Sequence, residues 1–350
     1  MQSLMKSPAL LRSAAAACLV GVAMCGGAIA QDKVYKVAGS TLTGEIRSTS
    51  PNEVVIAVRG KDESVATDEV QRVLFDGEPS ELTRAKESAA MGQWEQAAEQ
   101  IKAVDAASLT SDAVKQDYQY YRGMVSARLA LAGQGNVGAA AAAMLNYAKA
   151  NPRSHHFYEL AEVVGALAAA SGSYADAVKY YTAIGNAPFP PYKLKSAYLV
   201  GTALLADGKA AEARAEFEKV KSAAAADPTS QRYQKLASVA AIRADIVAGE
   251  AAAAVESLLA MVAEGDSTDG LLFSEIYNTL GEAHLKLEQP GEAKLAYLHT
   301  DLLFPGDPEN HAEALYFLGQ LWDQGGEPQR ATDARSRLKE RYANTAWARK

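Results

Sequence analysis

A spaced pattern of glycine and alanine recurs from about residue 80 to the end of this 350-residue chain and leaves few folds open to it. In the segments GQWEQAAEQI, GSYADAVKYY and GKAAEARAEF, which begin at Gly92, Gly172 and Gly208, the glycine precedes an alanine by five positions. A larger residue follows that alanine four positions later. Small residues let two helices approach closely while the larger one fills the seam, so the pattern predicts helical hairpins.

Extending this register gives one anchor alanine in each of seven copies. Successive anchors are separated by 43, 37, 36, 41, 39 and 38 residues. Because a single hairpin cannot bury its apolar face alone, we expect the copies to stack into one solenoid. Two of the anchors lie within alanine runs, so the register of copies two and five stays open. The anchors are Ala97, Ala140, Ala177, Ala213, Ala254, Ala293 and Ala331.

The last two copies carry the fullest version of the pattern. The residues concerned are Tyr277, Leu280, Gly281, His284, Ala293, Tyr297 and Pro305 in copy six, and Leu315, Leu318, Gly319, Trp322, Gly326 and Ala331 in copy seven. Their arrangement resembles the tetratricopeptide repeat, in which W-x2-L-G-x2-Y is followed by A-x3-F and a proline. The resemblance covers residues 80–350. It implies a mainly α fold, an α-α superhelix of about seven helical hairpins, that binds peptides or partner proteins.

Residues 31–79 have a different pattern. Alternating runs rich in β-branched residues surround Ile46 and Ile56, and the turn-forming pair Pro51-Asn52 separates them. Such runs with frequent turns predict four or five short strands. The segment resembles SH3-like and Sm-like modules, which implies a small β-barrel before the solenoid. Some Sm-like proteins bind RNA, but six Lys and Arg against nine Asp and Glu up to residue 80 argue against that use here.

The first thirty residues are predicted to be a secretory signal peptide. An apolar run too short to span a membrane follows Lys6 and Arg12, and the small-x-small sequence at its end marks a cleavage site after Ala30. The mature chain is therefore expected in the periplasm or cell envelope of a bacterium. An uncleaved anchor helix and a lipoprotein processed at Cys18 or Cys25 remain as alternatives.

Cleavage after residue 30 would change the chemistry open to the chain. Cys18 and Cys25 are its two cysteines, so the mature chain would have no thiol for a disulfide, a nucleophile or a metal site. Loss of Lys6 and Arg12 changes the formal net charge from −7 to about −9. An acidic chain without a basic stripe is a poor nucleic-acid binder. No other apolar stretch approaches the length of a membrane span, so we expect no nucleic-acid partner and no transmembrane segment in the mature chain.

Two short patterns resemble a cofactor site or a metal site, but the residues around them do not predict the structure that such a site needs. The sequence GQGNVG at 133–138 matches G-x-G-x-x-G, but the VSARLALA before it has helical character, so a lengthened turn in copy two is favoured over a dinucleotide site. His155 and His156 are adjacent, and on a helix their side chains would diverge by about 100° and could not hold one ion. With no nucleophile elbow, P-loop or HExxH, we assign no catalytic, cofactor-binding or metal-binding residue.

Tyr118, Tyr120 and Tyr121 form the densest aromatic cluster. Helical geometry puts Tyr118 and Tyr121 on one face and Tyr120 on another, which favours packing between repeats over a ligand platform. The sequence NAPFPP at 186–191 predicts a stiff loop that bends the stack between copies three and four.

The repeat register also predicts which side chains face the concave surface formed by the first helix of each hairpin. Acids outnumber bases among them, which indicates a basic or amide-rich partner segment, although a merely solvated face fits the same pattern. Charge reversal at Glu275 and Glu282 is then expected to weaken partner capture. The candidate partner-binding residues are Glu159, Glu162, Lys195, Tyr198, Glu275, Asn278, Glu282, Glu313, Tyr316, Gln320 and Asp323.

Taken together, these patterns favour a non-enzymatic exported scaffold that binds a protein or peptide partner through the concave face and needs no cofactor. A fixed structural subunit of a cell-envelope assembly or secretion complex is the alternative. An enzyme is disfavoured because no nucleophile and base are spaced for catalysis.

Overall fold

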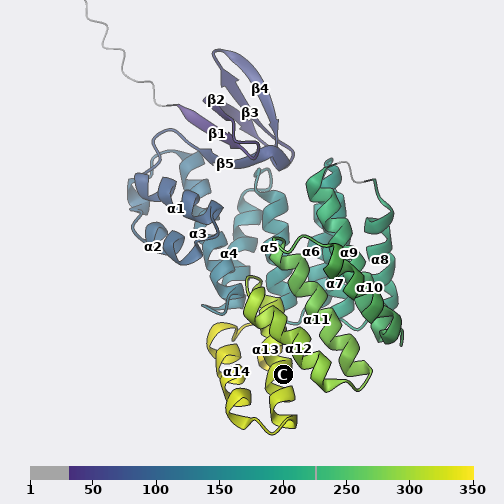
Figure 1. Cartoon of the computed structure of the whole chain (residues 1–350). Coiled ribbons are helices and arrows are strands. Elements are labelled where there is room, and N and C mark those ends of the chain that lie inside the picture. The colour runs from purple at the N-terminus through teal and green to yellow at the C-terminus, as the bar shows by residue number, and fades with distance from the viewer. Residues whose placement is uncertain (1–30, 225–226) are drawn as a thin grey trace, which may run out of the picture. The chain divides into compact units, whose positions relative to one another are not determined.

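The alternating segment near the start of the chain forms a five-stranded antiparallel sheet (Figure 1). The computed structural model describes residues 31–224 and 227–350, so the predicted signal peptide and both cysteines lie outside the described residues. The strands are β1 (Asp32–Lys36), β2 (Thr41–Thr49), β3 (Glu53–Val58), β4 (Lys61–Ala66) and β5 (Val70–Leu74).

The sheet is open, with β4 and β5 at its two edges. Its strand order is β4-β3-β2-β1-β5, and a short 3-10 helix, η1 (Thr67–Glu69), connects the two edge strands. The strands follow the predicted alternation, whereas a closed barrel is not formed in the described part of the chain, because no ladder joins β4 to β5. The β-branched side chains buried between the strands are Val34, Val54, Ile56, Val65 and Val73.

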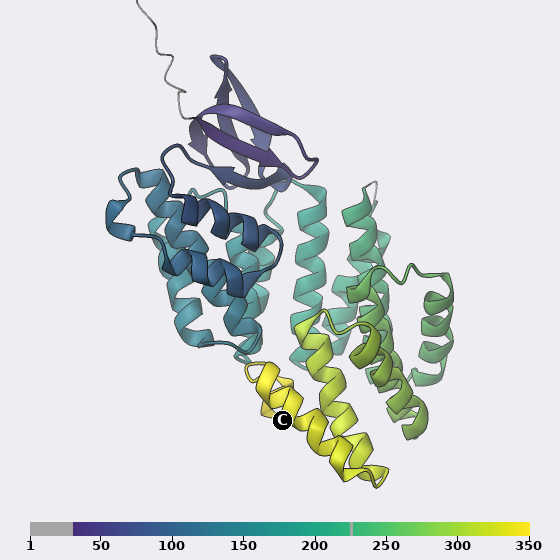
Figure 2. The same ribbon diagram turned by 60° about the vertical axis from the view of Figure 1, so that its left-hand side comes forward.

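Helices make up the remainder of the described chain, which is 67% helical and thus mainly α (Figures 1 and 2). They pair into seven antiparallel hairpins, one for each anchor alanine. The hairpins are α1 (Ser80–Ala90) with α2 (Trp94–Lys102), α3 (Asp112–Leu131) with α4 (Val137–Ala150), α5 (Phe157–Ala170) with α6 (Tyr174–Ile184), α7 (Pro190–Ala206) with α8 (Ala210–Ser222), α9 (Pro228–Val247) with α10 (Ala251–Glu264), α11 (Gly270–Lys286) with α12 (Pro290–Leu303), and α13 (Pro308–Gln324) with α14 (Pro328–Arg341).

Contacts between small and large residues hold each hairpin together. Every anchor alanine lies on the second helix and is at most 4% exposed. In copies three, four and six the residue four positions later is aromatic and packs on a glycine of the first helix. A Cβ on Gly201 would lie 2.4 Å from the ring of Phe217, and one on Gly281 would lie 2.5 Å from the ring of Tyr297. The regular spacing of glycine, alanine and aromatic residue in the sequence therefore reflects direct contact between the two helices of a hairpin.

Copies two and five keep a buried anchor alanine despite their alanine runs, and copy two also keeps the contact on a glycine. Ala140 is 1% exposed and Ala254 is 4% exposed, as anchors should be. The small residue of copy two is Gly123, whose Cβ would lie 2.6 Å from the sulfur of Met144. Gly123 precedes its anchor by 17 positions instead of the 12 found in other copies, because the GQGNVG sequence lengthens the connector between α3 and α4. Asn136 in this connector caps α4, so the sequence is a turn between helices.

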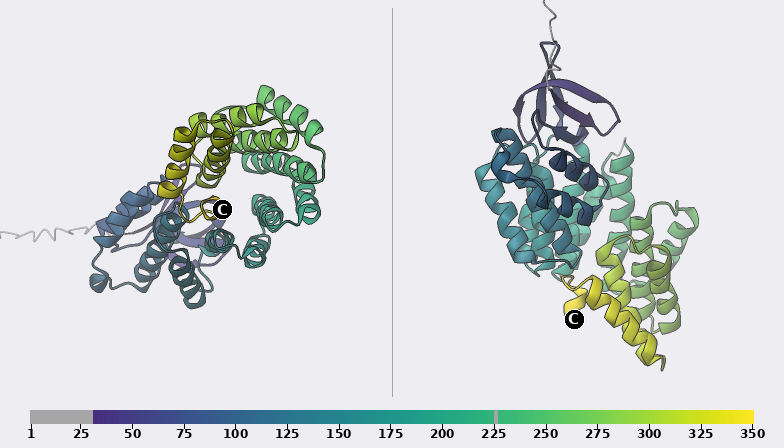
Figure 3. Two further views of the ribbon diagram at one scale, coloured as in Figure 1. Left: turned by 90° about the horizontal axis from the view of Figure 1, so that it is seen from below. Right: turned by 90° about the vertical axis from the view of Figure 1, so that its left-hand side faces the viewer.

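The first helices of neighbouring hairpins contact one another and form a continuous row (Figure 3). These contacts are weaker between α5 and α7 than between α3 and α5 or between α7 and α9. Side-chain contacts connect α5 to α7 where their backbones make few contacts. The rings of Tyr158 and Tyr192 lie 5.5 Å apart, and Lys195 forms an ion pair with Glu162. The proline pair of NAPFPP begins α7 at this point.

The sheet is joined to the helices by polar contacts, one of them fully buried. Lys86 of α1 is fully buried and donates to the carbonyl oxygen of Val73 on β5 at 3.0 Å. The Tyr158 hydroxyl on α5 donates to Oδ1 of Asn52 at 2.9 Å. Both contacts fix the edge of the sheet that carries η1 and β5 against the first helices.

The segment after α14 packs on the long connector of copy two. The side-chain amide of Asn344 donates to the carbonyl oxygens of Ala130, at 2.8 Å, and Gly135, at 3.0 Å. Copies two and seven are thus joined directly. Among the described helices, none combines the length and the apolar character that a membrane span needs.

Candidate functional site

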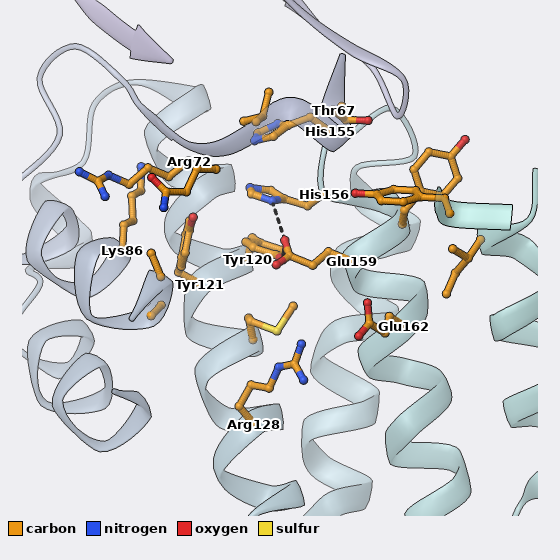
Figure 4. Close-up of a pocket in the computed structure, with 18 of the residues that line it drawn as sticks. Thr67, Arg72, Lys86, Tyr120, Tyr121, Arg128, His155, His156, Glu159 and Glu162 are labelled. Carbon is orange, nitrogen blue, oxygen red and sulfur yellow. Dashed lines mark hydrogen bonds and ion pairs between the residues drawn. The ribbon is translucent and has the colours of Figure 1, made fainter. Parts of the chain in front are cut away.

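A cavity of about 280 Å³ lies where the sheet meets the first helices of the early hairpins (Figure 4). Its walls come from η1 and β5 on the sheet, from helices α1, α2, α3, α5, α6 and α7, and from the turn before α5. Aromatic and charged side chains make up most of the lining. Those that matter below are Arg72, Lys86, Trp94, Tyr120, Tyr121, Arg128, His155, His156, Tyr158, Glu159, Glu162, Tyr192 and Lys195.

Helical spacing explains why these side chains converge. Tyr120 and Arg128 are eight positions apart on α3, which places them on one face, two turns from each other. Glu159 and Glu162 are three positions apart on α5, and Lys195 approaches them from α7. The cavity is therefore built on helices of four successive hairpins and is completed by the sheet.

Tyr120 stands at the centre of an aromatic stack in the cavity wall. Its ring lies on that of His156 with a centroid separation of 3.5 Å and an angle of 6° between the planes. Tyr121 meets both rings edge-on, at 5.2 Å and 5.7 Å. The Tyr120 hydroxyl donates to Oε2 of Glu159 at 2.5 Å, which connects α3 to α5. Tyr120 and Tyr121 thus lie in the seam between copies two and three and also line the cavity, whereas Tyr118 is outside the lining.

The predicted divergence of His155 and His156 is wrong. Helix α5 begins at Phe157, so both histidines lie in the turn before it, and their ring centroids are 3.8 Å apart. One potential ligand atom from each of them and from Asp117 of α3 lies within 4.8 Å of the others. Within the described residues these three side chains could hold a metal ion.

Lys86 opposes that use of the cluster. Its ammonium group forms ion pairs with Asp117 and with Glu78, and the side chains of Lys86 and Asp117 are 0% and 3% exposed. A divalent cation on Asp117 would lie beside this ammonium, and the two charges would repel strongly in a buried setting. We therefore assign Asp117 to a buried ion-pair network.

Hydrogen bonds fix the charge states within this network. Nε2 of His156 lies 2.8 Å from Oδ1 of Asp117, and Nδ1 lies 3.7 Å from Oε2 of Glu159. Burial opposes the charge on Asp117, but Lys86 and His156 hold its pKa well below the usual range. The Glu159 side chain is 57% exposed, and its contacts with His156 and Tyr120 lower its pKa to about 2. The same carboxylates raise the pKa of His156 against the effect of its burial, so the imidazolium is the favoured form.

His155 and two arginines carry buried side-chain nitrogen atoms that have no hydrogen-bond partner in the described structure. Burial, and then the neighbouring imidazolium of His156, lower the pKa of His155 to about 3, so its ring is neutral. Its Nε2, and the Nε atoms of Arg72 and Arg128, are buried without a hydrogen-bond partner among the described residues. A buried polar atom left unpaired costs about 1–3 kcal/mol. All three atoms belong to residues that line the cavity.

The predicted partner-binding residues of copies three and four lie in or beside the cavity. Glu159, Glu162 and Lys195 line it. Glu162 and Lys195 form an ion pair in which each side chain is about one quarter exposed, at 23% and 24%. Tyr198 is 8% exposed and packs against Phe217, outside the lining.

Further along the row, the predicted acids surround one arginine. Arg243 of α9 forms ion pairs with Glu275 and Glu282 of α11 and with Glu313 of α13. Asn278 donates to Glu313 at 3.2 Å. Burial raises the pKa of Glu275 to about 7 although Arg243 opposes the shift. These acids are engaged within the chain, so their number says little about the charge of a partner.

The remaining predicted residues lie near the C-terminal segment. The rings of Tyr316 and Trp347 are 5.4 Å apart, Asp323 pairs with Arg335 of α14, and Gln320 is half-buried. The structure thus distributes the eleven residues over three places along the first-helix row instead of one site.

Sequence analysis missed the charged residues that shape the cavity. Lys86 is flanked on α1 by the buried residues Leu82, Ala85 and Ala89, so helical spacing alone puts it on the buried face. Asp117 has an equivalent position on α3. A lysine and an aspartate on buried helix faces indicate that each has a partner of opposite charge, but the sequence does not predict that these two residues contact each other.

A scan against protein-family models finds no match, and a comparison with curated proteins finds none either. Among solved structures, the chain is similar to a tetratricopeptide repeat protein from Parabacteroides merdae ATCC 43184, with a TM-score of 0.50 and 12% identity over 75% of this chain and 91% of that one. It is also similar to the APC/C hetero-tetramer Cut9-Hcn1, with a TM-score of 0.48 and 14% identity over 76% of this chain and 47% of that one. A third similar structure is NprR in complex with its cognate peptide NprX, with a TM-score of 0.42 and 13% identity over 74% of this chain and 76% of that one. The first likeness shows the fold, a solenoid of helical hairpins like those of tetratricopeptide repeat proteins.

Proposed function

We propose that the chain is an exported, non-enzymatic scaffold that binds a segment of a protein partner in the cavity between its sheet and its first helices. One observation carries the proposal: the cavity is built jointly by four successive hairpins and the sheet, and the Nε donors of Arg72 and Arg128 in its lining are buried without hydrogen-bond partners among the described residues. Helical solenoids present extended surfaces of this kind to their partners.

The size of the cavity supports a partner side chain as its occupant. Pockets for drug-sized molecules measure roughly 300–1,000 Å³, and this one measures about 280 Å³. One or two side chains of an extended segment fit such a volume, while the rest of the segment can follow the first-helix row. The aromatic walls, which include Tyr120 and Tyr192, offer apolar contact, and the charged groups offer orientation.

A non-enzymatic role is supported by how the titratable groups of the site are used. His156, Asp117 and Glu159 hold one another in their charged forms. Lys195 and Glu162 form an ion pair in the same way. None of these groups is a free base placed beside a nucleophile, which acyl or phosphoryl transfer would need.

In this proposal the small β module acts as a cap that completes the site. Arg72 and Thr67 enter the lining from β5 and η1. Lys86 and Tyr158 fix that edge of the sheet to the helices. The strand pattern and its connection through η1 agree with an SH3-like or Sm-like relationship, with the sheet left open.

The test is affinity capture from a cell-envelope fraction, with partners identified by mass spectrometry. Ala90 is exposed at the cavity, so Ala90→Trp fills it, while Ala211→Trp adds the same side chain at an exposed position of α8 outside it. We expect the wild-type chain and the Ala211→Trp variant to capture the same protein and Ala90→Trp to lose it. Equal capture by all three would contradict the proposed site.

Export has its own test, because it rests on residues 1–30. Expression of the full-length chain in a bacterium, followed by fractionation and N-terminal sequencing, should give a periplasmic or envelope product that starts at Gln31. An unprocessed chain confined to the cytoplasm would contradict export.

A further inference from the structure

The lining of the cavity is cationic although the chain as a whole is acidic. Five lining side chains carry positive charge when His156 is protonated, against two carboxylates. The whole chain has a formal net charge of −7. Carboxylates outside the lining pair with Lys86 and Arg72, so the attraction of the cavity for an anionic group depends on which of its cations has no ion-pair partner. The cationic side chains are Arg72, Lys86, Arg128, His156 and Lys195, and the carboxylates are Glu159 and Glu162.

Most of these cations are already engaged by the chain itself. Lys86 is held by Glu78 and Asp117, Lys195 by Glu162, and Arg72 by Glu87 at 3.4 Å. Arg128 differs, since no carboxylate within the described residues forms an ion pair with it. It is therefore the cation best able to receive an anion from outside.

The environment of Arg128 prepares its guanidinium for that contact. The group lies 5.6 Å from the centroid of the Trp94 ring, which limits its motion. Its Nε is buried and makes no hydrogen bond in the described structure. A planar guanidinium with free donors matches a carboxylate through two parallel hydrogen bonds.

The neighbouring carboxylates limit the charge of the occupant. Glu159 and Glu162 line the same cavity, and Arg128 contributes to the low pKa of Glu159. A dianion such as a phosphate monoester would be repelled by both glutamates more strongly than a monoanion. The aromatic walls formed by Tyr120 and Tyr192 suit the apolar stem that carries such a group.

We infer that the group accepted by this cavity is a carboxylate of the partner, held by the guanidinium of Arg128. The inference rests on the proposed function, since it names the chemistry of the partner segment. An acidic side chain and the free end of a peptide chain offer the same group, and the experiments distinguish them.

A matched pair of small probes tests the carboxylate contact without any partner. Phenylacetate and phenylacetamide have nearly the same shape and differ in charge. Titrations followed by NMR on the full-length chain should show phenylacetate binding at least about tenfold more tightly than the amide, because hydrogen bonds to a charged group are the stronger ones. Equal binding of the two probes would overturn the inference.

Substitutions on α3 test whether Arg128 causes the preference for phenylacetate over phenylacetamide. Arg128→Gln should bring the affinities for phenylacetate and phenylacetamide to within about a factor of two of each other. Arg128→Lys keeps the positive charge but loses the planar guanidinium with its paired donors, so it should retain part of the preference for phenylacetate. Arg122 is an exposed arginine on the same helix that does not line the cavity, so Arg122→Gln should behave as the wild type. An unchanged preference in Arg128→Gln, with its thermal unfolding unaltered, would overturn the inference.

Peptide arrays connect the inference to the proposed function. On an array with amidated chain ends, binders enriched in Asp or Glu at one position would identify a side-chain carboxylate. On an array with free ends, binding lost on amidation would identify the chain end. Binders that are only basic or neutral would overturn the inference. Phenylacetate binding through Arg128 without any peptide binder would support the carboxylate contact and contradict the proposed function.

Discussion

The ammonium group of Lys86 forms an ion pair with the carboxylate of Asp117, and the two side chains are 0% and 3% exposed. The pair connects α1 to α3, and Lys86 also reaches the carbonyl oxygen of Val73 on the sheet. Three parts of the molecule therefore share one buried charge. This contact positions the β5 edge of the sheet over the cavity, so it is structural and sets the geometry of the site at the same time.

Removal of the buried ammonium should be costly. Lys86→Met leaves Asp117 and Glu78 buried without their cation, and breaking such a pair typically costs about 3–5 kcal/mol. Urea denaturation should show a loss of this size in the free energy of unfolding. Addition of Asp117→Asn to the same chain should recover part of it, because one uncompensated charge is then removed. A loss below about 1 kcal/mol in the single variant would show that the pair is not buried in solution.

Stability should depend on pH through Glu275. Burial raises its pKa from 4.5 to about 7 in the folded chain despite Arg243. Between those pH values the folded state binds more protons than the unfolded state, so stability falls as the pH rises through this window. Glu275→Gln removes the effect. The variant should gain about 1–3 kcal/mol relative to wild type between pH 4.5 and pH 8 in urea denaturation. A difference that stays constant with pH would contradict this assignment.

The glycine–aromatic contacts can be tested by adding one methyl group. Gly281→Ala would place a Cβ 2.5 Å from the ring of Tyr297, which is fully buried. Alanine usually stabilises a helix by about 0.5–1 kcal/mol relative to glycine, but forcing a group into a packed core costs about 1–3 kcal/mol. We expect a net loss of about 1–2 kcal/mol in urea denaturation. Gly291→Ala on α12, where nothing lies within 4 Å, is the control and should be neutral or stabilising.

This contact also explains why the helical part of the fold was predictable. Gly281 and Tyr297 lie on adjacent helices of one hairpin, 16 positions apart, so a short sequence window records their packing. The strands of the sheet were readable for the same reason, since alternation is local. Whether the sheet closes depends on how β4 and β5 approach each other, which a local pattern does not encode.

The cavity was not predictable, because its contacts join distant parts of the chain. Lys86 meets Asp117 across 31 positions, and Tyr120 meets Glu159 across 39. The prediction that His155 and His156 diverge assumed that both lie on a helix, but α5 begins one residue after His156. The charge of the partner was inferred from acids such as Glu275, which Arg243 engages instead.

The link between copies two and seven should matter for the last hairpin. Asn344 donates one hydrogen bond to the last turn of α3, at Ala130, and one to the connector after it, at Gly135. Asn344→Ala leaves those carbonyl oxygens without this donor, and a loss of about 1–2 kcal/mol is expected. Hydrogen exchange should become faster in α13 and α14 and stay unchanged in α7 and α8. Unchanged exchange in α13 and α14 would mean that the contact does not stabilise the array.

Partner binding in the cavity is the central claim, and site-specific photo-crosslinking tests it most directly. Gln71 is exposed and lines the cavity, so a benzoylphenylalanine at this position should give one discrete crosslinked product in cells of the native host. The same group at Ala175, exposed on α6 and outside the lining, should give none, and Ala90→Trp should abolish the product at Gln71. A product that forms at Ala175 but not at Gln71, or that survives Ala90→Trp, would contradict the account.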